Sequence, residues 1–270
     1  LNLHDRMVIP QWAGQPQKEE ITIDQMLHML SGLKFEDKFL IKDDQAEMLM
    51  LHGNMAKYAA GKELKYEPGT HWKYSSGTSL ILSRHLKSII GKDDYLPFIY
   101  RELLYKIGMN SALVETDLDG TFVASSYIYA TTRDYARFGQ LFLNDGVVDG
   151  ERILPTWWRH YSTETVPQSG KDCFAAHFYS NDHGQWKGVP TDAFMAQGFL
   201  GQMIAIVPSR GLVVIRLGHS TFGWPWDSQD FLADVIAALP CRTVRAIDFN
   251  ERLARLKERY RSRVRNTLAN

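Results

Sequence analysis

Cysteine is scarce in this sequence: only Cys173 and Cys241 are present, and they form no C-x-x-C pair. Two cysteines cannot build the disulfide framework that stabilises many small secreted domains. We expect two free thiols, with a single disulfide between them as the alternative. Long apolar runs are lacking as well. None approaches the ~18 residues of a membrane-spanning helix, so this segment is not expected to enter a membrane.

Motifs for cofactors and metals are also missing. The sequence has no G-x-G-x-x-G and no G-x-x-x-x-G-K-[ST], and none of its nine histidines belongs to an H-E-x-x-H motif. The G-x-S-x-G elbow of α/β-hydrolases is absent too. These absences argue against nucleotide and metal chemistry, so we expect no cofactor and no metal.

The sequence lacks an excess of charge of either sign. Lys plus Arg and Asp plus Glu both number 31, which gives a formal net charge of zero. Because a nucleic-acid-binding domain usually carries a basic excess, nucleic acid is not expected as a partner. The 270 residues, 44% of them hydrophobic, suffice for one sizeable domain with or without an appendage.

The pattern along the chain predicts helices first and strands later. Thr22 and Gln25 have the spacing of a capping box. Amphipathic helices are expected over residues 21–33, 71–91, 95–107, 131–146 and 227–239. Two β-rich runs at 201–208 and 211–218 flank a Pro-Ser-Arg turn. This order predicts an α+β fold in which an antiparallel sheet is flanked by helices.

The last thirty or so residues differ from the rest. From Arg242 onward, nine Arg or Lys residues face three acids along a helical stripe of Leu, Tyr and Val. We therefore divide the chain into a domain over residues 1–240 and a basic helical tail over residues 241–270. A solvated or partner-packed helix is the simpler interpretation of the tail, and a basic helix at a membrane surface is the alternative.

Four stretches resemble one protein family. They are ITIDQMLHMLSGL (21–33), YEPGTHWKYSSGTSLILSRHL (66–86), ASSYIYATTRDYARFGQLFLNDGVVDGERILP (124–155) and FMAQGFLGQMIAIVPSRGLVVIRLG (194–218). They are similar, in the same order, to segments of the penicillin-recognising serine hydrolases related to class C β-lactamases, penicillin-binding proteins and 6-aminohexanoate-dimer hydrolases. The resemblance covers about residues 20 to 240, and it implies a serine β-lactamase/DD-peptidase-like fold that lacks its N-terminal part.

The chemistry that this resemblance implies is acyl transfer. In the family a serine attacks a carbonyl, a lysine three residues later takes its proton, and a tyrosine of a second motif relays a proton. The tyrosine here would be Tyr74. Ser76 stands where the family's Y-x-N pattern has Asn, a variant of its esterase and linear-amide branches, and would hold the lysine and the substrate by hydrogen bonds. Ordinary packing of an aromatic ring at a helix start is the alternative for Tyr74.

The family's third motif aligns with Ala196-Gln197-Gly198. Gly198 lets backbone and substrate approach closely, and the N–H of Phe199 would be one oxyanion-hole donor. Gln197 belongs to the same substrate-binding strand, and Gln202 either supports this loop or touches substrate. Ala196 removes the cation that would pair with a β-lactam carboxylate, so a neutral ester or amide is the expected substrate.

The expected nucleophile is not found. The one S-x-x-K in the sequence, Ser31 to Lys34, follows an amphipathic helix instead of starting one, and Gly32 disfavours a helical turn between the two side chains. The family order places the true pair before Leu1. We expect a fragment of a longer product, with a truncated homologue or a first segment on a separate chain as alternatives.

The sequence therefore predicts a serine hydrolase of small esters or linear amides that acts through an acyl-serine intermediate, inactive as this segment alone. The alternative is an inactive homologue that uses the same cleft to bind a peptide or cell-wall ligand. The oligomeric state is not predicted.

Overall fold

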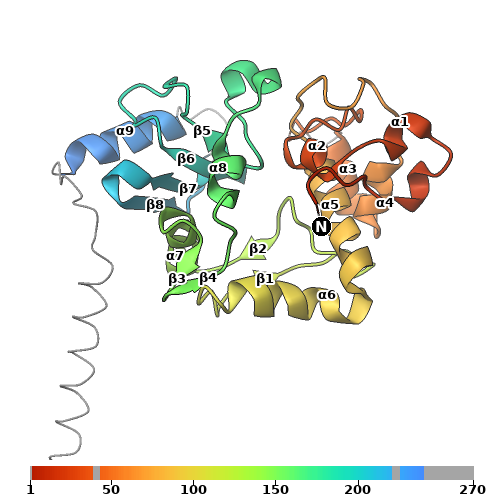
Figure 1. Cartoon of the computed structure of the whole chain (residues 1–270), viewed down its shortest axis with the longest axis horizontal. Coiled ribbons are helices and arrows are strands. Elements are labelled where there is room, and N and C mark those ends of the chain that lie inside the picture. The colour runs from red at the N-terminus through yellow and green to blue at the C-terminus, as the bar shows by residue number, and fades with distance from the viewer. Residues whose placement is uncertain (1, 39–42, 221–225, 240–270) are drawn as a thin grey trace, which may run out of the picture.

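The computed structural model describes residues 2–38, 43–220 and 226–239. Figure 1 shows two groups of elements: helices α1 to α5 on one side, and strands β5 to β8 with helices α7 to α9 on the other. We call them the helical lobe and the sheet lobe. Helix α6 and strands β1 and β2 run between the two (Figure 1). The mixture of helices and an antiparallel sheet confirms the expected α+β class.

The helical lobe is built from short helices packed around one long helix. Its elements are η1 (Pro10–Trp12), α1 (Pro16–Glu19), α2 (Ile23–Leu27), α3 (Asp44–Leu51), α4 (Met55–Ala60) and α5 (Ser76–Ile90). The apolar sides of these elements meet in one core around Trp12, Met26 and Leu80, all fully buried. The indole of Trp12 also donates to the carbonyl of Ala60 at 3.0 Å. Helix α5 is therefore held from several sides, which fixes the residues at its start.

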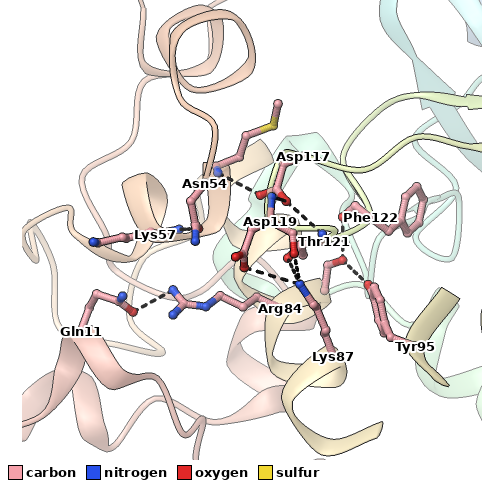
Figure 2. Close-up of polar contacts among 12 residues, drawn as sticks. Gln11, Asn54, Lys57, Arg84, Lys87, Tyr95, Asp117, Asp119, Thr121 and Phe122 are labelled. Atoms are coloured by element: carbon pink, nitrogen blue, oxygen red, sulfur yellow. Dashed lines mark hydrogen bonds and ion pairs between the residues drawn. The ribbon is translucent and has the colours of Figure 1, made fainter. Parts of the chain in front are cut away.

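The connection between the lobes consists of α6 (Lys92–Ile99), a π-helical turn η2 (Tyr100–Leu104), and the antiparallel pair β1 (Leu113–Val114) and β2 (Ile128–Tyr129). Figure 2 shows how the loop between these strands is tied to the helical lobe. The Asp117 carboxylate accepts from the backbone N–H groups of Met55 and Thr121 at 3.0 and 2.9 Å. The Lys87 ammonium binds the carbonyl of Asp119. These contacts tie the loop to α4 through Met55 and to α5 through Lys87.

The sheet lobe contains α7 (Thr132–Leu143), β3 (Val147–Val148), β4 (Glu151–Arg152), α8 (Trp158–Thr163), η3 (Pro167–Asp172), β5 (Tyr179–Ser180), β6 (Phe194–Gly198), η4 (Phe199–Gly201), β7 (Gln202–Val207), η5 (Pro208–Arg210), β8 (Leu212–Arg216) and α9 (Ser228–Ala238). The main sheet is antiparallel in the order β5-β6-β7-β8. Its two faces follow from side-chain alternation. The pair Met195 and Ala205 faces the core shared with α9, whereas the pair Phe194 and Ile206 faces α7.

Most expected elements are present, but the helix expected over 95–107 consists of α6 and the π-helical turn η2, and other elements differ as well. The helix expected over 21–33 has the Thr22–Gln25 capping box, but α2 ends at Leu27 because Met29 adopts a left-handed φ of 60°. Helices α3 and α4 were not predicted, because their residues read as a polar stretch. The basic tail lies outside the described residues. Among the described helices, none is both long and apolar enough to cross a membrane.

Candidate active site

Tyr74 lies directly before the start of α5, where the two lobes meet. The α5 N-cap is Ser75, whose hydroxyl accepts from the N–H of Thr78 at 3.2 Å. The half-buried Tyr74 ring packs edge-to-face against Phe174 of the sheet lobe, with ring centroids 6.1 Å apart. Burial raises the pKa of the Tyr74 phenol, and Tyr179 and Asp37 raise it further. At neutral pH the phenol is therefore a protonated donor.

Ser76 begins α5 and is almost fully buried. Its backbone N–H donates to the Asp37 carboxylate at 2.7 Å, and its hydroxyl accepts from the Gln45 amide at 3.1 Å. Both partners belong to the helical lobe. The Ser76 side chain is thus engaged by the protein itself, and its expected contacts with a lysine and with substrate stay a prediction.

Asp37 is a residue of this site that the sequence did not single out. One carboxylate oxygen accepts from Ser76, and the other, Oδ1, is enclosed without a hydrogen-bond partner within the described residues. Burial raises the pKa of this carboxyl group, against the effect of the hydrogen bonds from Ser76. The residues on either side of Asp37 form no recognised motif, so nothing in the sequence pointed to it.

Tyr179 is the second residue that the sequence missed. It lies on β5, pairs with Met195 of β6, and packs edge-to-face on Phe174 with ring centroids 5.1 Å apart. Burial raises the pKa of its phenol to about 12, and the charge of Asp172 and then of Asp37 adds to this effect. The Phe174 ring thus contacts one tyrosine from each lobe, Tyr74 and Tyr179.

The third-motif residues lie on β6 and in the turn that follows it. Gly198 pairs with Gln202, and a Cβ at Gly198 would lie 2.9 Å from the Gln202 Cβ, so the hairpin end needs a glycine here. The Gln197 amide donates to the hydroxyl of Ser228 at 3.1 Å, which ties β6 to the start of α9. Phe199 has an exposed ring, with 51% of its surface accessible.

Gln202 closes the opposite side of this hairpin. Its amide group donates to the carbonyl of Gly218 and accepts from the Gly218 N–H at 3.0 Å. The side chain therefore continues the β7–β8 ladder beyond Arg216. These bonds join Gln202 to Gly218, and both roles expected for Gln202, support of the loop after Gly198 and contact with substrate, stay predictions.

The Ser31–Lys34 pair does not have the geometry of a catalytic dyad. Ser31 lies in an irregular segment after α2, and Gly32 between the two residues has a left-handed φ of 72°. The Lys34 ammonium pairs with the Glu63 carboxylate at 2.8 Å on the surface. Because the two residues do not share one helical turn, the lysine is not placed to take a proton from Ser31.

The lobes are held together by polar contacts as well as by rings. The Tyr161 hydroxyl of α8 donates to the Asp24 carboxylate of α2 at 2.8 Å. The Gln168 amide donates to the Gly69 carbonyl at 3.1 Å. Within the described residues, no three His, Cys, Asp or Glu side chains gather as metal ligands would. The site as described is one of hydroxyl, amide and carboxylate groups.

Comparison with known proteins gives one family match and several related structures. A family model described as Beta-lactamase matches residues 1–238. An uncharacterised protein of Alkalihalophilus pseudofirmus is 28% identical over 117 residues, which cover 40% of this chain and 34% of that protein.

Two solved structures illustrate the shared fold. A Bacillus anthracis chain named as a 6-aminohexanoate-dimer hydrolase aligns with a TM-score of 0.68 and 20% identity, over 87% of this chain and 64% of that one. A family VIII carboxylesterase aligns with a TM-score of 0.60 and 14% identity, over 86% of this chain and 75% of the esterase. This chain thus spans about a third of the curated relative and less than two thirds of the Bacillus structure.

Proposed function

The chain belongs to the Beta-lactamase family, and from this premise we propose that the complete protein hydrolyses small esters or linear amides through an acyl-serine intermediate. The observation that carries the proposal is the position of Tyr74. Its phenol lies at the junction of the lobes, and its hydroxyl has no hydrogen-bond partner within the described residues. A donor that is protonated and unengaged suits a proton relay.

The proposed reaction begins with a serine oxygen attacking the substrate carbonyl. The serine proton passes to a lysine three residues later, and the Tyr74 phenol relays a proton to the leaving alcohol or amine. Water then attacks the acyl-serine ester and releases the acid. Because the Ser31–Lys34 pair lacks the required geometry, we place the serine and its lysine in a segment that precedes Leu1.

The sheet lobe supplies the rest of the proposed site. The N–H of Phe199, after Gly198, would donate to the oxyanion, together with the N–H of the attacking serine. Gln197 and Gln202 would complete the substrate-binding strand and its loop. Ala196 at the position of the usual cation supports a neutral ester or amide over an anionic β-lactam. The names of the aligned structures, a carboxylesterase and a 6-aminohexanoate-dimer hydrolase, point the same way.

The second candidate function is an inactive homologue that binds a peptide or cell-wall ligand at the same place. The observation that favours it is the Ser76 hydroxyl, which is bound by Gln45 instead of facing a catalytic lysine. A chain that had lost catalysis would have no need to keep this hydroxyl free.

Expression of the gene product together with its upstream coding sequence distinguishes the serine hydrolase from the inactive binding homologue. We expect an in-frame S-x-x-K upstream and hydrolysis of p-nitrophenyl butyrate, with Tyr74→Phe lowering kcat at least about 100-fold, in the range of general acid–base catalysis. Tyr129→Phe, at a half-exposed tyrosine of β2, is the control and should keep full activity. A start codon at this point, with no hydrolysis by the product, would favour the binding module. Full activity of Tyr74→Phe would remove Tyr74 from the mechanism.

A further inference from the structure

We infer that Arg216 is a positioning residue of this site, and that its guanidinium holds the turn after β6 in the conformation that the reaction needs. The turn is η4 (Phe199–Gly201), the part of the sheet lobe in which the proposed function places an oxyanion donor. The inference rests on that function and adds to it a residue that the sequence did not single out. Three features carry it: the strain of the turn, the bonds to its carbonyl groups, and the way the arginine is held.

The turn contains a residue in an unfavourable backbone conformation. Leu200 has a φ of 57° and a ψ of 30°, in the left-handed region that glycine occupies more easily than leucine does. A non-glycine residue stays in this region only where its surroundings hold it there, and such residues concentrate at functional sites. The contacts of the turn therefore have to compensate for this strain.

Two of the three carbonyl groups in the turn are bound by β8 and the segment that follows it. The Arg216 guanidinium donates from Nη1 to the Gly201 carbonyl at 2.6 Å, and the Ser220 N–H donates to the Leu200 carbonyl at 2.9 Å. Nη2 of the same guanidinium donates to the Ser220 hydroxyl at 2.7 Å. Arg216 thus binds the end of the turn directly, and it also binds the residue that holds the middle.

The guanidinium itself is held in one position. It lies over the Trp226 ring, 4.1 Å from the ring centroid, in a stacking arrangement that suits the planar group of arginine and not the ammonium of lysine. A Cβ at Gly201 would lie 2.5 Å from Arg216 Nη1 and 3.1 Å from Cε3 of Trp226. The backbone of the turn therefore packs directly against both groups, and a guanidinium fixed in this way fixes the turn as well.

The remaining peptide group of the turn then has little freedom. Gly198 pairs with Gln202 where β6 meets β7, so the sheet sets both ends of the turn. Because the carbonyls of Leu200 and Gly201 are also bound, the orientation of the peptide between Gly198 and Phe199 follows from the rest. The N–H of this peptide is the proposed oxyanion donor, and such a donor is effective only when it is oriented before the reaction.

The charge of Arg216 has no other use within the part of the chain that the structure describes. There its hydrogen bonds go to a backbone carbonyl and a hydroxyl, and it forms no ion pair. A hydrogen bond from a charged donor is stronger than one from a neutral donor. The charge therefore strengthens the bond to the Gly201 carbonyl, and lysine would supply the charge without the planar pair of donors.

The test uses the complete gene product and two substrates: p-nitrophenyl butyrate, and its thionoester with sulfur in place of the carbonyl oxygen. Sulfur is the weaker hydrogen-bond acceptor, so a well-placed oxyanion donor favours the oxygen ester. Spontaneous hydrolysis is subtracted for each. We expect Arg216→Lys to lower kcat for the oxygen ester about 10- to 100-fold, less than the loss of a whole donor, with KM changed less than about threefold. The oxygen-to-sulfur ratio of kcat/KM should fall about tenfold.

The ratio separates positioning from stability, because partial unfolding lowers the rates of both esters equally. Arg101→Ala is the matched control, since it removes a surface arginine that pairs with Glu102, and it should keep the wild-type kcat and ratio. A wild-type ratio in Arg216→Lys overturns the inference, whatever the loss of rate, while hydrolysis itself upholds the proposed function. If the wild-type protein hydrolyses neither ester, the proposed function fails and the inference falls with it.

A second measurement isolates the guanidinium group. Arg216→Ala leaves open the place between Gly201 and the Trp226 ring, which a free guanidinium ion fits. Guanidinium chloride at tens of millimolar, far below denaturing concentrations, should raise kcat of this variant severalfold and restore the oxygen-to-sulfur ratio, whereas Arg101→Ala should not respond. Recovery of kcat without recovery of the ratio, or no recovery in a folded variant, overturns the inference. If Arg216→Ala does not fold, the ratio in Arg216→Lys decides.

Discussion

The hydroxyl of Tyr161 donates a hydrogen bond to the carboxylate of Asp24 at 2.8 Å, and this bond joins helix α8 of the sheet lobe to helix α2 of the helical lobe. His28, one turn after Asp24, lies edge-on to the Tyr161 ring with centroids 5.1 Å apart. Burial and the Asp24 carboxylate both raise the pKa of Tyr161. The phenol is therefore protonated at neutral pH and can donate to Asp24.

Tyr161→Phe should weaken this link. The variant keeps the ring and removes only the donor to a charged acceptor, a change that typically costs about 1.5 to 3 kcal/mol. We expect the free energy of unfolding in urea to fall by about 1 to 2 kcal/mol, because the Asp24 carboxylate is partly exposed and water replaces part of the bond. Tyr129→Phe, with a half-exposed ring, is the control. Equal unfolding midpoints for the two variants would show that the bond does not hold the lobes.

His177 makes stability depend on pH. Burial first, and the nearby His28 second, lower the pKa of its imidazole to about 4, and its Nε2 is enclosed without a partner within the described residues. The unfolded chain has the ordinary value near 6.5. Between these two values the unfolded state binds more protons than the folded state. The contribution of neutral His177 to the free energy of unfolding is therefore fully present above about pH 6.5 and is lost as pH falls toward 4.

His177→Asn tests this dependence. Asparagine suits the left-handed φ of 62° at this position. From pH 7.5 to 5, the wild-type protein should lose about 2 kcal/mol of unfolding free energy that the variant keeps, as measured by urea titrations at the two pH values. His160→Asn, at an exposed histidine, should retain the wild-type slope. An unchanged slope in His177→Asn would assign the pH dependence to other groups.

The helices that the sequence predicted are those with strong local signals. The Thr22–Gln25 capping box occurs as expected, and Thr131 and Asp227 cap the helices expected over 131–146 and 227–239, because a cap depends on a few adjacent residues. The same reasoning missed α3 and α4, whose caps Asp43 and Asn54 stand among polar residues. These short helices are stabilised by packing on α5, which a local pattern does not encode.

The candidate site was predictable only in part. Tyr74 and Gly198 lie in motifs that family resemblance identifies. Tyr179 meets Tyr74 only through Phe174, and Asp37 is joined to the start of α5 only through its bond to Ser76. No spacing in the sequence brings residues so far apart into one place. The partners of Ser76 and Gln202 were likewise set by the fold, since their hydrogen bonds join separate elements.

Gln202→Ala should loosen the end of the β7–β8 hairpin. The wild-type side chain bonds both backbone groups of Gly218, and their loss should cost about 1 kcal/mol. We expect amide exchange of Gly218 to accelerate about tenfold, whereas the amide of Ile215 inside the ladder keeps its rate. Gln197→Ala is the comparison, because its partner is the Ser228 hydroxyl instead. Unchanged exchange at Gly218 would show that these two bonds do not hold the hairpin end, and would favour a contact of Gln202 with substrate.

Gly139 lies inside helix α7, at a point where the helix packs closely against the sheet. A Cβ there would lie 2.5 Å from Cγ1 of Val213 on β8 and 3.4 Å from Cγ2 of Ile204 on β7, so the helix approaches the sheet too closely for a side chain. Alanine is the better helix former by about 1 kcal/mol, but overpacking costs about 1 to 3 kcal/mol. We expect Gly139→Ala to lower the free energy of unfolding by up to about 2 kcal/mol, the difference between the two effects.

The double variant Gly139→Ala/Val213→Ala separates steric contact from loss of backbone freedom. If the valine side chain is the obstacle, its removal frees the space that the new methyl group needs. The double variant should then be at least about 1 kcal/mol more stable than the sum of the two single changes predicts, well beyond the ~0.5 kcal/mol scatter of independent sites. Urea denaturation of the four proteins gives this coupling energy. Simple additivity would mean that helix α7 shifts away from the sheet at little cost, and that the glycine is not required by the close approach to β8.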